Sequence, residues 1–267
     1  MNILVTNDDG IFAPGVSMLV EVLQHFGDVY IVCPDKEQSA VSHSITLRRP
    51  LKARAVHIFP GAKGAWAVNG TPADCIKLGL DVLLDAEPDI VFSGLNAGPN
   101  IGRDCYYSGT MAGAAEASLY GVRAVSMSLN AFQESEMKES QVRPLIYDVV
   151  RTISQHKIPK GMFLNINFPN LPKHQCEGVA VVPLDMAVSR YRHAGFHDPH
   201  GNAFHWLKDE WIKVEHAKED SDFSKLKQGY VTVSPVEFRQ AQTRKREQIE
   251  KWFQEVPTIQ KEETTHA

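Results

Sequence analysis

Short apolar runs, rich in β-branched residues, recur through the first half of the chain. They have the length of buried strands and lie at residues 2–6, 29–34, 65–68, 89–93 and 124–129. Between the first two, Val16, Leu19 and Leu23 are spaced to share one face of a helix, and Gly27 is a stop signal. Strand, helix and strand in this order predict right-handed parallel crossovers, and therefore an α/β fold with a mainly parallel sheet.

Three further helices are indicated by their start signals. Thr71 is a favourable N-cap, with Pro72 at the first helical position and Asp74 three residues after the cap. An Ala-rich helix is predicted after residues 108–110. Another is predicted to begin near Pro144, because the apolar residues that follow share one face; these are Leu145, Ile146, Val149, Val150 and Ile153.

The second half of the chain has a looser rhythm. Strands are predicted at 163–168, 179–184 and 229–236, and the polar, aromatic-rich stretch 190–210 lies between them. Such a pattern is typical of hairpins and arms that serve in subunit association. The weakly alternating stretch 43–56 predicts a pair of extended arms as well.

Four histidines and the charged tail complete this half of the chain. The histidines match no zinc spacing, so we interpret them as part of a solvated loop; they are His193, His197, His200 and His205. The tail 237–255 is predicted to be a charged helix, and 258–267 a polar, frayed end.

Composition narrows the class of protein. The 267 residues suffice for one large α/β domain, or for one domain with a smaller appendage. A net charge of −4 does not favour a surface for nucleic acid or anionic lipid. The four cysteines show neither CxxC pairing nor zinc spacing, and no apolar run has the length of a membrane span. With no recognisable signal segment, we expect a cytoplasmic protein without a nucleic-acid or membrane partner.

The most informative stretch is NDDG, directly after the first predicted strand. Asp8 and Asp9 would lie at the carboxyl end of that strand, where open α/β sheets bind their ligands. Adjacent carboxylates repel each other unless a cation or a shared proton separates them, and oxygen ligands suit magnesium or manganese. The alternative is that one aspartate caps the next helix while the other is solvated. The pair alone does not decide between these interpretations.

Three other loops end at the same predicted edge of the sheet. Ser39 follows the second strand, where its hydroxyl would reach a shared cation, although a plain loop residue is the alternative. Asn96 follows the strand at 89–93 in a long Gly-rich loop and is a neutral oxygen donor for a metal or a phosphate. Ser108, Gly109 and Thr110 start a helix, where free amides favour an anion; an ordinary cap without ligand is the alternative.

Five motifs together resemble the SurE family of survival proteins, which are metal-dependent nucleoside monophosphate phosphatases. They are NILVTNDDG, PDKEQSAVSHSIT, NGTPADC, PDIVFSGLNAGPNIG and YYSGTMAGAAEA, in this order. The resemblance is dense over residues 1–130 and weaker through LNINFP at 164–169, HWL ending at Leu207, and 220–236. It departs from the family pattern at Ala40, where glycine is usual, in SGTMAGAAEA, and in the stretch before His197.

The resemblance implies a site, a fold and an assembly. One divalent cation, Mg²⁺ or Mn²⁺, would be bound by Asp8, Asp9, Ser39 and Asn96, and the phosphate would lie at 108–110. The fold would be a Rossmann-like doubly wound sheet with C-terminal hairpin and helix extensions that exchange between subunits of a homodimer or homotetramer. We expect residues 1–130 to form the catalytic core, and 131–267 to complete the single domain and carry these arms.

The sequence therefore predicts a phosphomonoesterase acting on nucleoside 5′- and 3′-monophosphates, with short polyphosphate as a further substrate. In this hypothesis a bound water attacks the phosphorus in line, and the catalytic residues are Asp8, Asp9, Asn96, Ser108 and Thr110. The alternatives are a phosphatase for another small phosphoester and a non-catalytic, regulatory nucleotide-binding protein.

Overall fold

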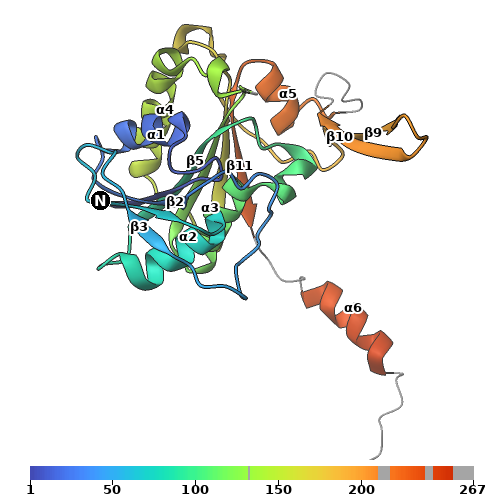
Figure 1. Cartoon of the computed structure of the whole chain (residues 1–267), viewed down its shortest axis with the longest axis horizontal. Coiled ribbons are helices and arrows are strands. Elements are labelled where there is room, and N and C mark those ends of the chain that lie inside the picture. Colours follow the sequence, from blue (N-terminus) through green and yellow to red (C-terminus); the bar gives the residue numbers. More distant parts are fainter. Residues whose placement is uncertain (132, 210–216, 238–242, 255–267) are drawn as a thin grey trace, which may run out of the picture. The chain divides into compact units, whose positions relative to one another are not determined.

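The computed structural model describes residues 1–131, 133–209, 217–237 and 243–254 (Figure 1). The chain divides into two compact units, Met1–Glu237 and Phe238–Ala267. Helix α6 (Thr243–Gln254) is the described part of the second unit and confirms a helix in the charged tail. The predicted frayed end lies outside the described residues. Among the described helices, none has the length and apolar character needed to cross a membrane.

The first unit is built on a sheet with the strand order β3-β4-β2-β1-β5-β6-β7-β11-β8. Its strands are β1 (Asn2–Thr6), β2 (Asp28–Pro34), β3 (Ala53–Ala55), β4 (Gly64–Val68), β5 (Ile90–Ala97), β6 (Arg123–Leu129), β7 (Met162–Phe168), β8 (Val179–Val181) and β11 (Val231–Glu237). The six strands from β4 to β7 in this order are parallel to one another, whereas β3 pairs antiparallel with β4 and β11 pairs antiparallel with β7. Strand β8 is parallel to β11. The predicted α/β class and mainly parallel sheet are confirmed.

The strand order reverses direction beside β1. From β1 the chain adds β2 and β4 on one side, and then returns to add β5, β6 and β7 on the other. Loops that leave neighbouring strands on opposite sides of this point separate and open a crevice at the carboxyl ends of the strands. The segments after β1, β2, β5 and β6 all leave the sheet at that edge.

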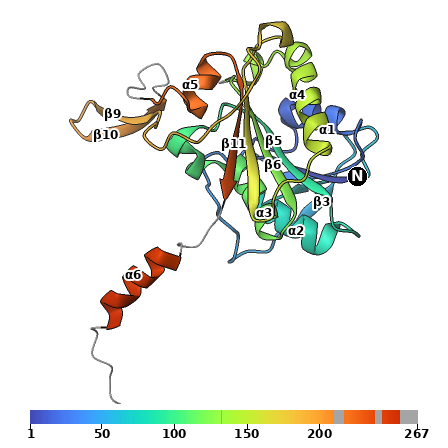
Figure 2. The ribbon, with the colours of Figure 1, turned by 180° about the vertical axis from the view of Figure 1, so that it is seen from behind.

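Helices cover both faces of the sheet, as Figures 1 and 2 show. Alternation along β1 accounts for the two layers: Ile3 and Val5 pack with α1 (Pro14–Leu23) and α4 (Glu139–Ser154) in one core. Leu4 faces the other core, with α2 (Pro72–Leu78) and α3 (Gly109–Leu119). The shorter helices are η1 (Gly79–Leu83), η2 (Gly102–Tyr107), η3 (Glu134–Glu136), η4 (Lys173–Gln175) and α5 (Asp222–Lys227).

The start of α2 confirms the predicted cap. The Thr71 hydroxyl accepts from the Asp74 backbone N–H at 3.1 Å, and the Asp74 carboxylate accepts from the Thr71 N–H at 2.9 Å. Pro72 occupies the first turn, where its missing N–H costs nothing. Asp74 also accepts from the backbone and hydroxyl of Thr46, which fastens the extended 43–52 stretch to this helix. Of the predicted arms at 43–56, only β3 is a strand.

Helix α4 begins five residues before the predicted start. It starts at Glu139, with Pro144 inside it. The backbone N–H groups of Gln141 and Val142 donate to the Lys138 carbonyl and close the first turn. Val142 is fully buried on the face that Leu145, Ile146 and Val149 share. Burial of this side chain favours an additional turn before Pro144, and the helix accommodates the proline.

The His-rich stretch is a hairpin, which confirms the hairpin predicted for this half of the chain, whereas the interpretation of its four histidines as part of a loop is wrong. Strand β9 (Tyr191–His197) pairs antiparallel with β10 (Ala203–Asp209), and His200 lies in the turn between them. Strand pairing satisfies backbone hydrogen bonds of both segments, although neither of them shows the strict alternation of a half-buried strand. Four large apolar side chains are exposed on the hairpin: Phe196, Phe204, Trp206 and Leu207. Figures 1 and 2 show the hairpin projecting from the sheet.

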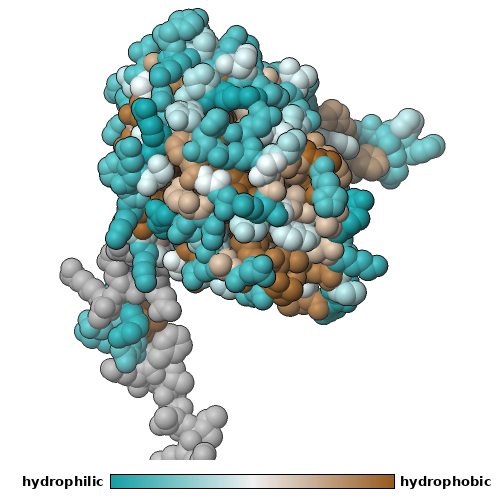
Figure 3. Space-filling view, turned by 90° about the vertical axis from the view of Figure 1, so that its left-hand side faces the viewer, coloured by the Kyte–Doolittle hydropathy of each residue, from teal (hydrophilic) through white to brown (hydrophobic). Residues whose placement is uncertain are grey.

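One face of the molecule is mainly hydrophilic (Figure 3). Figure 3 shows one face covered largely by hydrophilic residues, with a smaller apolar area in its lower part. Apolar residues of the parallel strands are fully buried instead, among them Leu4, Ile31, Val91 and Val125. This partition is what the continuous apolar runs of the sequence predict for strands that are covered on both faces.

Candidate active site at the carboxyl ends of the parallel strands

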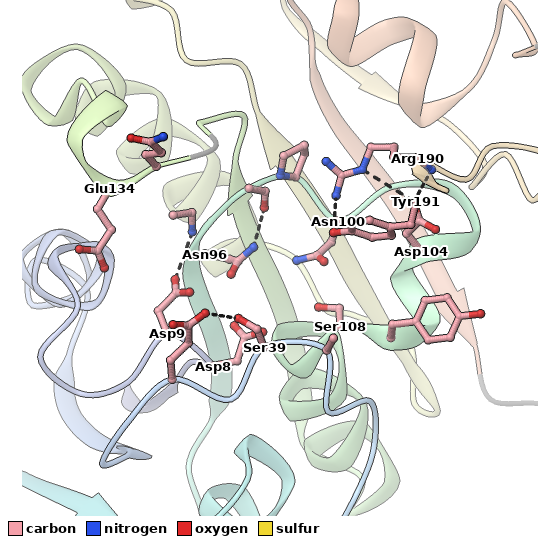
Figure 4. Close-up of a pocket in the computed structure, with 17 residues that line it drawn as sticks. Asp8, Asp9, Ser39, Asn96, Asn100, Asp104, Ser108, Glu134, Arg190 and Tyr191 are labelled. Carbon is pink, nitrogen blue, oxygen red and sulfur yellow. Dashed lines mark hydrogen bonds and ion pairs between the residues drawn. The ribbon is translucent and has the colours of Figure 1, made fainter. Parts of the chain in front are cut away.

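A cavity of about 410 Å³ opens at the carboxyl edge of the sheet, beside the point where the strand order reverses. Its lining includes Asp8, Asp9, Glu37, Ser39, Asn96, Asn100, Asp104, Ser108, Glu134, Arg190 and Tyr191. Figure 4 shows two ends with different chemistry. We call the first, with Asp8, Asp9, Ser39 and Asn96, the aspartate end. The second, with Asp104, Arg190 and Tyr191, is the arginine end.

Asp8 is buried and is fixed by the start of α3. The Thr110 hydroxyl donates to Asp8 Oδ1 at 2.5 Å, and the Gln38 N–H donates to the Asp8 carbonyl at 2.7 Å. Gly109 makes the close approach possible, because a Cβ there would lie 2.8 Å from Asp8 Cβ. Burial raises the pKa of Asp8 above its ordinary value, and the hydroxyl and backbone of Thr110 oppose that shift.

Asp9 places a second carboxyl group beside Asp8 at the aspartate end of the cavity. Its Oδ2 accepts from the Ala97 N–H at 3.1 Å, which ties the loop after β1 to the end of β5. Burial raises the pKa of Asp9 to about 7, and the charge of Asp8 adds to the rise. Two buried carboxylates this close together repel each other when both are charged. A bound cation would offset that repulsion, so the pair indicates a cation site.

The raised pKa of Asp9 gives a pH-dependent prediction for the metal-free protein. Between pH 3.8 and about 7 the folded state retains a proton that the unfolded chain has released, so this group's contribution to stability falls as pH rises through that window. Asp9→Asn carries no such proton. We therefore expect urea unfolding to show the variant gaining stability on wild type between about pH 5 and about pH 8. A difference in stability that does not change with pH would contradict this origin of the shift.

Ser39 and Asn96 reach the same end of the cavity. The Ser39 hydroxyl donates to Glu37 Oε1 at 2.5 Å, which leaves its lone pairs for another partner. Asn96 Nδ2 donates to the Gly98 carbonyl at 2.5 Å, and this fixes the orientation of the amide. Asn96 lies within β5, because the strand continues past a bulge to Ala97 instead of ending at Ser93. The structure thus brings together the four side chains predicted to bind a metal.

The three residues at the start of α3 have different surroundings. Ser108 is the N-cap, accepts from the Met111 N–H at 3.1 Å and lines the cavity. Thr110 is fully buried with its hydroxyl on Asp8, and Gly109 packs against the same aspartate. Part of the helix N-terminus therefore serves Asp8. The phosphate-binding role of residues 108–110 stays a prediction, with Ser108 the best placed of the three.

The arginine end was not found by reasoning from the sequence. Arg190 Nη1 donates to Asp209 Oδ2 at 3.0 Å, its Nη2 donates to the Tyr191 hydroxyl at 3.1 Å, and its Nε lies 3.7 Å from Asp104 Oδ2. Asp104 also accepts from the Ser189 hydroxyl at 2.9 Å. Asp104 is more than eighty positions from Ser189 and Arg190 in the chain. The only sequence signal was the length of the loop that contains Asp104.

The loop between the two ends is held by side chains of a neighbouring strand. The Asn100 N–H donates to Asn167 Oδ1 at 2.8 Å, and the Asn100 carbonyl accepts from Asn167 Nδ2 at 2.9 Å and from Asn165 Nδ2 at 2.8 Å. Both asparagines are fully buried in β7. This explains the polar residues in the apolar motif LNINFP: they fix the backbone of Asn100, which lines the cavity.

Comparison with known proteins now places the chain. The family model described as Survival protein SurE matches residues 3–191. The 5′-nucleotidase SurE of Pelotomaculum thermopropionicum is 41% identical over 239 residues, which is 89% of this chain and 90% of that protein. The chain belongs to the SurE family. The resemblance inferred from the five motifs is confirmed.

Other SurE proteins agree in sequence and in structure. The 5′-nucleotidase SurE of Gloeobacter violaceus is 38% identical over 89% of this chain and 90% of that protein. The crystal structure of the SurE protein from Aquifex aeolicus superposes with a TM-score of 0.82 at 34% identity, over 94% of this chain and 99% of that chain. The SurE fold is therefore shared along nearly the whole chain, which confirms the Rossmann-like class.

The side chains at the aspartate end of this SurE protein fit a divalent cation. Asp8 Oδ1 accepts from the Thr110 hydroxyl and Asp9 Oδ2 accepts from the Ala97 N–H. A carboxylate has about four lone-pair sites, so both side chains keep acceptor capacity for a metal. No group of three or more His, Cys, Asp or Glu suited to a metal is found among the described residues. The donor set is instead two carboxylates, a hydroxyl and an amide oxygen, which suits a hard ion such as Mg²⁺ or Mn²⁺ that keeps several waters.

Proposed function

We propose that this SurE protein hydrolyses nucleoside 5′-monophosphates, and 3′-monophosphates as well, at the cavity described above, with one Mg²⁺ or Mn²⁺ bound by Asp8, Asp9, Ser39 and Asn96. The observation that carries the proposal is the convergence of these four oxygen donors beside Ser108 at the carboxyl edge of the sheet. The relatives named 5′-nucleotidase SurE, at 37–41% identity over most of the chain, support the enzyme class and the substrate.

The charge of the cavity explains why a cation is required. Five carboxylates line it, those of Asp8, Asp9, Glu37, Asp104 and Glu134, and the described lining contains a single basic side chain, that of Arg190. A phosphate dianion would be repelled by this lining. A bound divalent ion supplies the positive charge that holds the phosphoryl oxygens and lowers the pKa of a coordinated water.

The protein's own groups position the reaction. Asp8 and Asp9 are held by Thr110 and Ala97, so their free oxygens keep a fixed direction. The Ser108 hydroxyl accepts from the Met111 N–H, and its own hydrogen is therefore available to a phosphoryl oxygen. Asp9, which lines the cavity beside Asp8, is our candidate to accept the proton of the attacking water.

The experiment is phosphate release from adenosine 5′- and 3′-monophosphate, short polyphosphate and sugar phosphates, after removal of divalent ions by a chelator. We expect no release until Mg²⁺ or Mn²⁺ is added, and the fastest release from a nucleotide. Because the cation is expected to bind the folded state, it should also raise the thermal unfolding temperature. Full activity in the chelator would contradict the proposed metal site.

The same assay separates the alternatives. Faster release from a sugar phosphate or polyphosphate than from any nucleotide would favour a phosphatase for another small phosphoester. Nucleotide binding with no release, at saturating metal, would favour a regulatory binding protein. The complete carboxylate pair argues against the latter, because binding alone needs only a helix N-terminus.

We further propose that the protein forms a homodimer or homotetramer through its C-terminal segments. The exposed apolar side chains of the β9–β10 hairpin support this, since Trp206 is 71% exposed and Phe204 is 54% exposed. Side chains of this kind are usually covered by a partner. Sedimentation of the protein, with and without polar substitutions at these two positions, would test the assignment.

A further inference from the structure

The two ends of the cavity suit different parts of a nucleotide. At the aspartate end the side chains are oxygen donors for a cation and its phosphate. At the arginine end the basic group already has acidic partners: Arg190 lies between Asp104 and Asp209, so this end carries no net positive charge to attract a second phosphate. The arginine end is therefore suited to an uncharged part of the substrate.

Tyr191 gives this end a flat aromatic surface. It is the first residue of β9 and lines the cavity, and Figure 4 shows it extending from the side of Arg190 toward Asn100. The hydroxyl is held by Arg190 Nη2 at 3.1 Å, and the guanidinium carbon lies 5.1 Å from the centre of the ring. The ring is partly buried and fixed at both its strand and its hydroxyl. An aromatic ring held in this way loses little conformational entropy when a ligand packs on it.

Cavity size supports a ligand that extends from one end to the other. The volume of about 410 Å³ is far larger than a phosphate group requires, and it falls in the range of sites for complete small molecules. Asn100 lies between the two ends, with its backbone fixed by Asn165 and Asn167. A ligand whose phosphate binds the cation at Asp8 and Asp9 would extend along Asn100 to Tyr191.

We propose that Tyr191 is the base-binding residue of the site, and that its ring packs against the nucleobase of the substrate while Arg190 and Asp104 hold the ring in place. The proposal rests on the proposed nucleotidase function and adds to it a residue that distinguishes a nucleotide from a bare sugar phosphate. Arg190 acts here as a positioning residue, because it donates to the Tyr191 hydroxyl and is itself held by Asp104 and Asp209.

The test compares adenosine 5′-monophosphate with ribose 5-phosphate, which has the same phosphate and sugar but no base. For Tyr191→Ala we expect KM for the nucleotide to rise roughly 10- to 100-fold, the range of a lost base–aromatic stack. The kcat/KM for ribose 5-phosphate should stay within about 3-fold of wild type, because that substrate does not reach the ring. Tyr191→Phe retains the ring and should restore the nucleotide KM.

Controls separate the possible failures. Tyr147→Ala removes a tyrosine of α4 outside the cavity and should leave both substrates unchanged. Equal losses on both substrates, or no loss on the nucleotide, would overturn the role of Tyr191. If wild type releases phosphate from neither substrate, the proposed function fails, and calorimetric binding of adenosine then tests the inference alone: binding must weaken in Tyr191→Ala and persist in Tyr191→Phe.

Discussion

Asp9→Asn is expected to lower phosphate release from adenosine 5′-monophosphate by roughly 10²- to 10³-fold at saturating metal, the loss typical of removing one preorganised charge-stabilising group. The amide keeps the shape of the carboxylate and can still accept from the Ala97 N–H. The substitution removes a negative charge that would balance the charge of a divalent ion. Initial rates measured over a range of Mg²⁺ concentrations would separate weaker metal binding from slower chemistry.

Asp28→Asn is the matched control for this variant. Asp28 begins β2 at the opposite edge of the sheet and is exposed, with its carboxylate 3.5 Å from Lys63 Nζ. Its loss should leave turnover unchanged, because exposed ion pairs contribute little and this one lies away from the cavity. Near wild-type turnover of Asp9→Asn would remove Asp9 from the site. Lower turnover in both variants would indicate a general effect of lost surface charge.

Arg190→Met is expected to lower the free energy of unfolding by about 3 kcal/mol, the lower part of the range for breaking a buried ion pair by removing one partner. Only 6% of the Arg190 side chain and 4% of the Asp104 side chain are exposed, so solvent cannot replace the lost charge. Asp104 retains its bonds from the Ser189 hydroxyl and the Arg190 N–H, which limits the loss. Urea unfolding would measure the change.

The control is Arg143→Met, which removes an arginine whose side chain is 42% exposed and which pairs with Glu21. A pair of this kind should contribute no more than about 1 kcal/mol. Asp104→Asn in the Arg190→Met background should recover part of the lost stability, because it removes the uncompensated buried charge. A loss no greater than that of Arg143→Met would show that the buried pair does not stabilise the fold.

The predictable parts of the fold came from local signals. Strand β1 was recognisable because apolar residues fill a run covered on both faces, and the start of α2 because Thr71, Pro72 and Asp74 form a cap within four residues. The predicted start of α4, near Pro144, lies five residues after the observed start at Glu139. The sequence shows the proline but not the burial that extends the helix toward its N-terminus. The pattern predicts hairpins in the second half but does not place β9 and β10 on the four histidines, because neither face of this hairpin is buried.

One end of the candidate site could be predicted from the sequence and the other could not. The aspartate end could be predicted because each of its side chains lies at the carboxyl end of a parallel strand or in the loop that follows it, and strand order alone brings such positions to one edge. The arginine end depends on contacts between Asp104, Arg190 and Asp209, which come from the short helix η2, the residue before β9 and the end of β10. No periodic pattern links those positions. Their pairing follows from the path of the chain after β8, which the sequence does not specify locally.

The hydrogen bonds between the Asn100 backbone and the side chains of Asn165 and Asn167 in β7 have a consequence for local unfolding. The Asn100 peptide donates and accepts through Asn167 as it would through a neighbouring strand, although it belongs to a connecting segment. Its amide proton can exchange with solvent only when β7 side chains release it. We therefore expect the Asn100 amide to be protected from exchange more strongly than the amides of the surface loops.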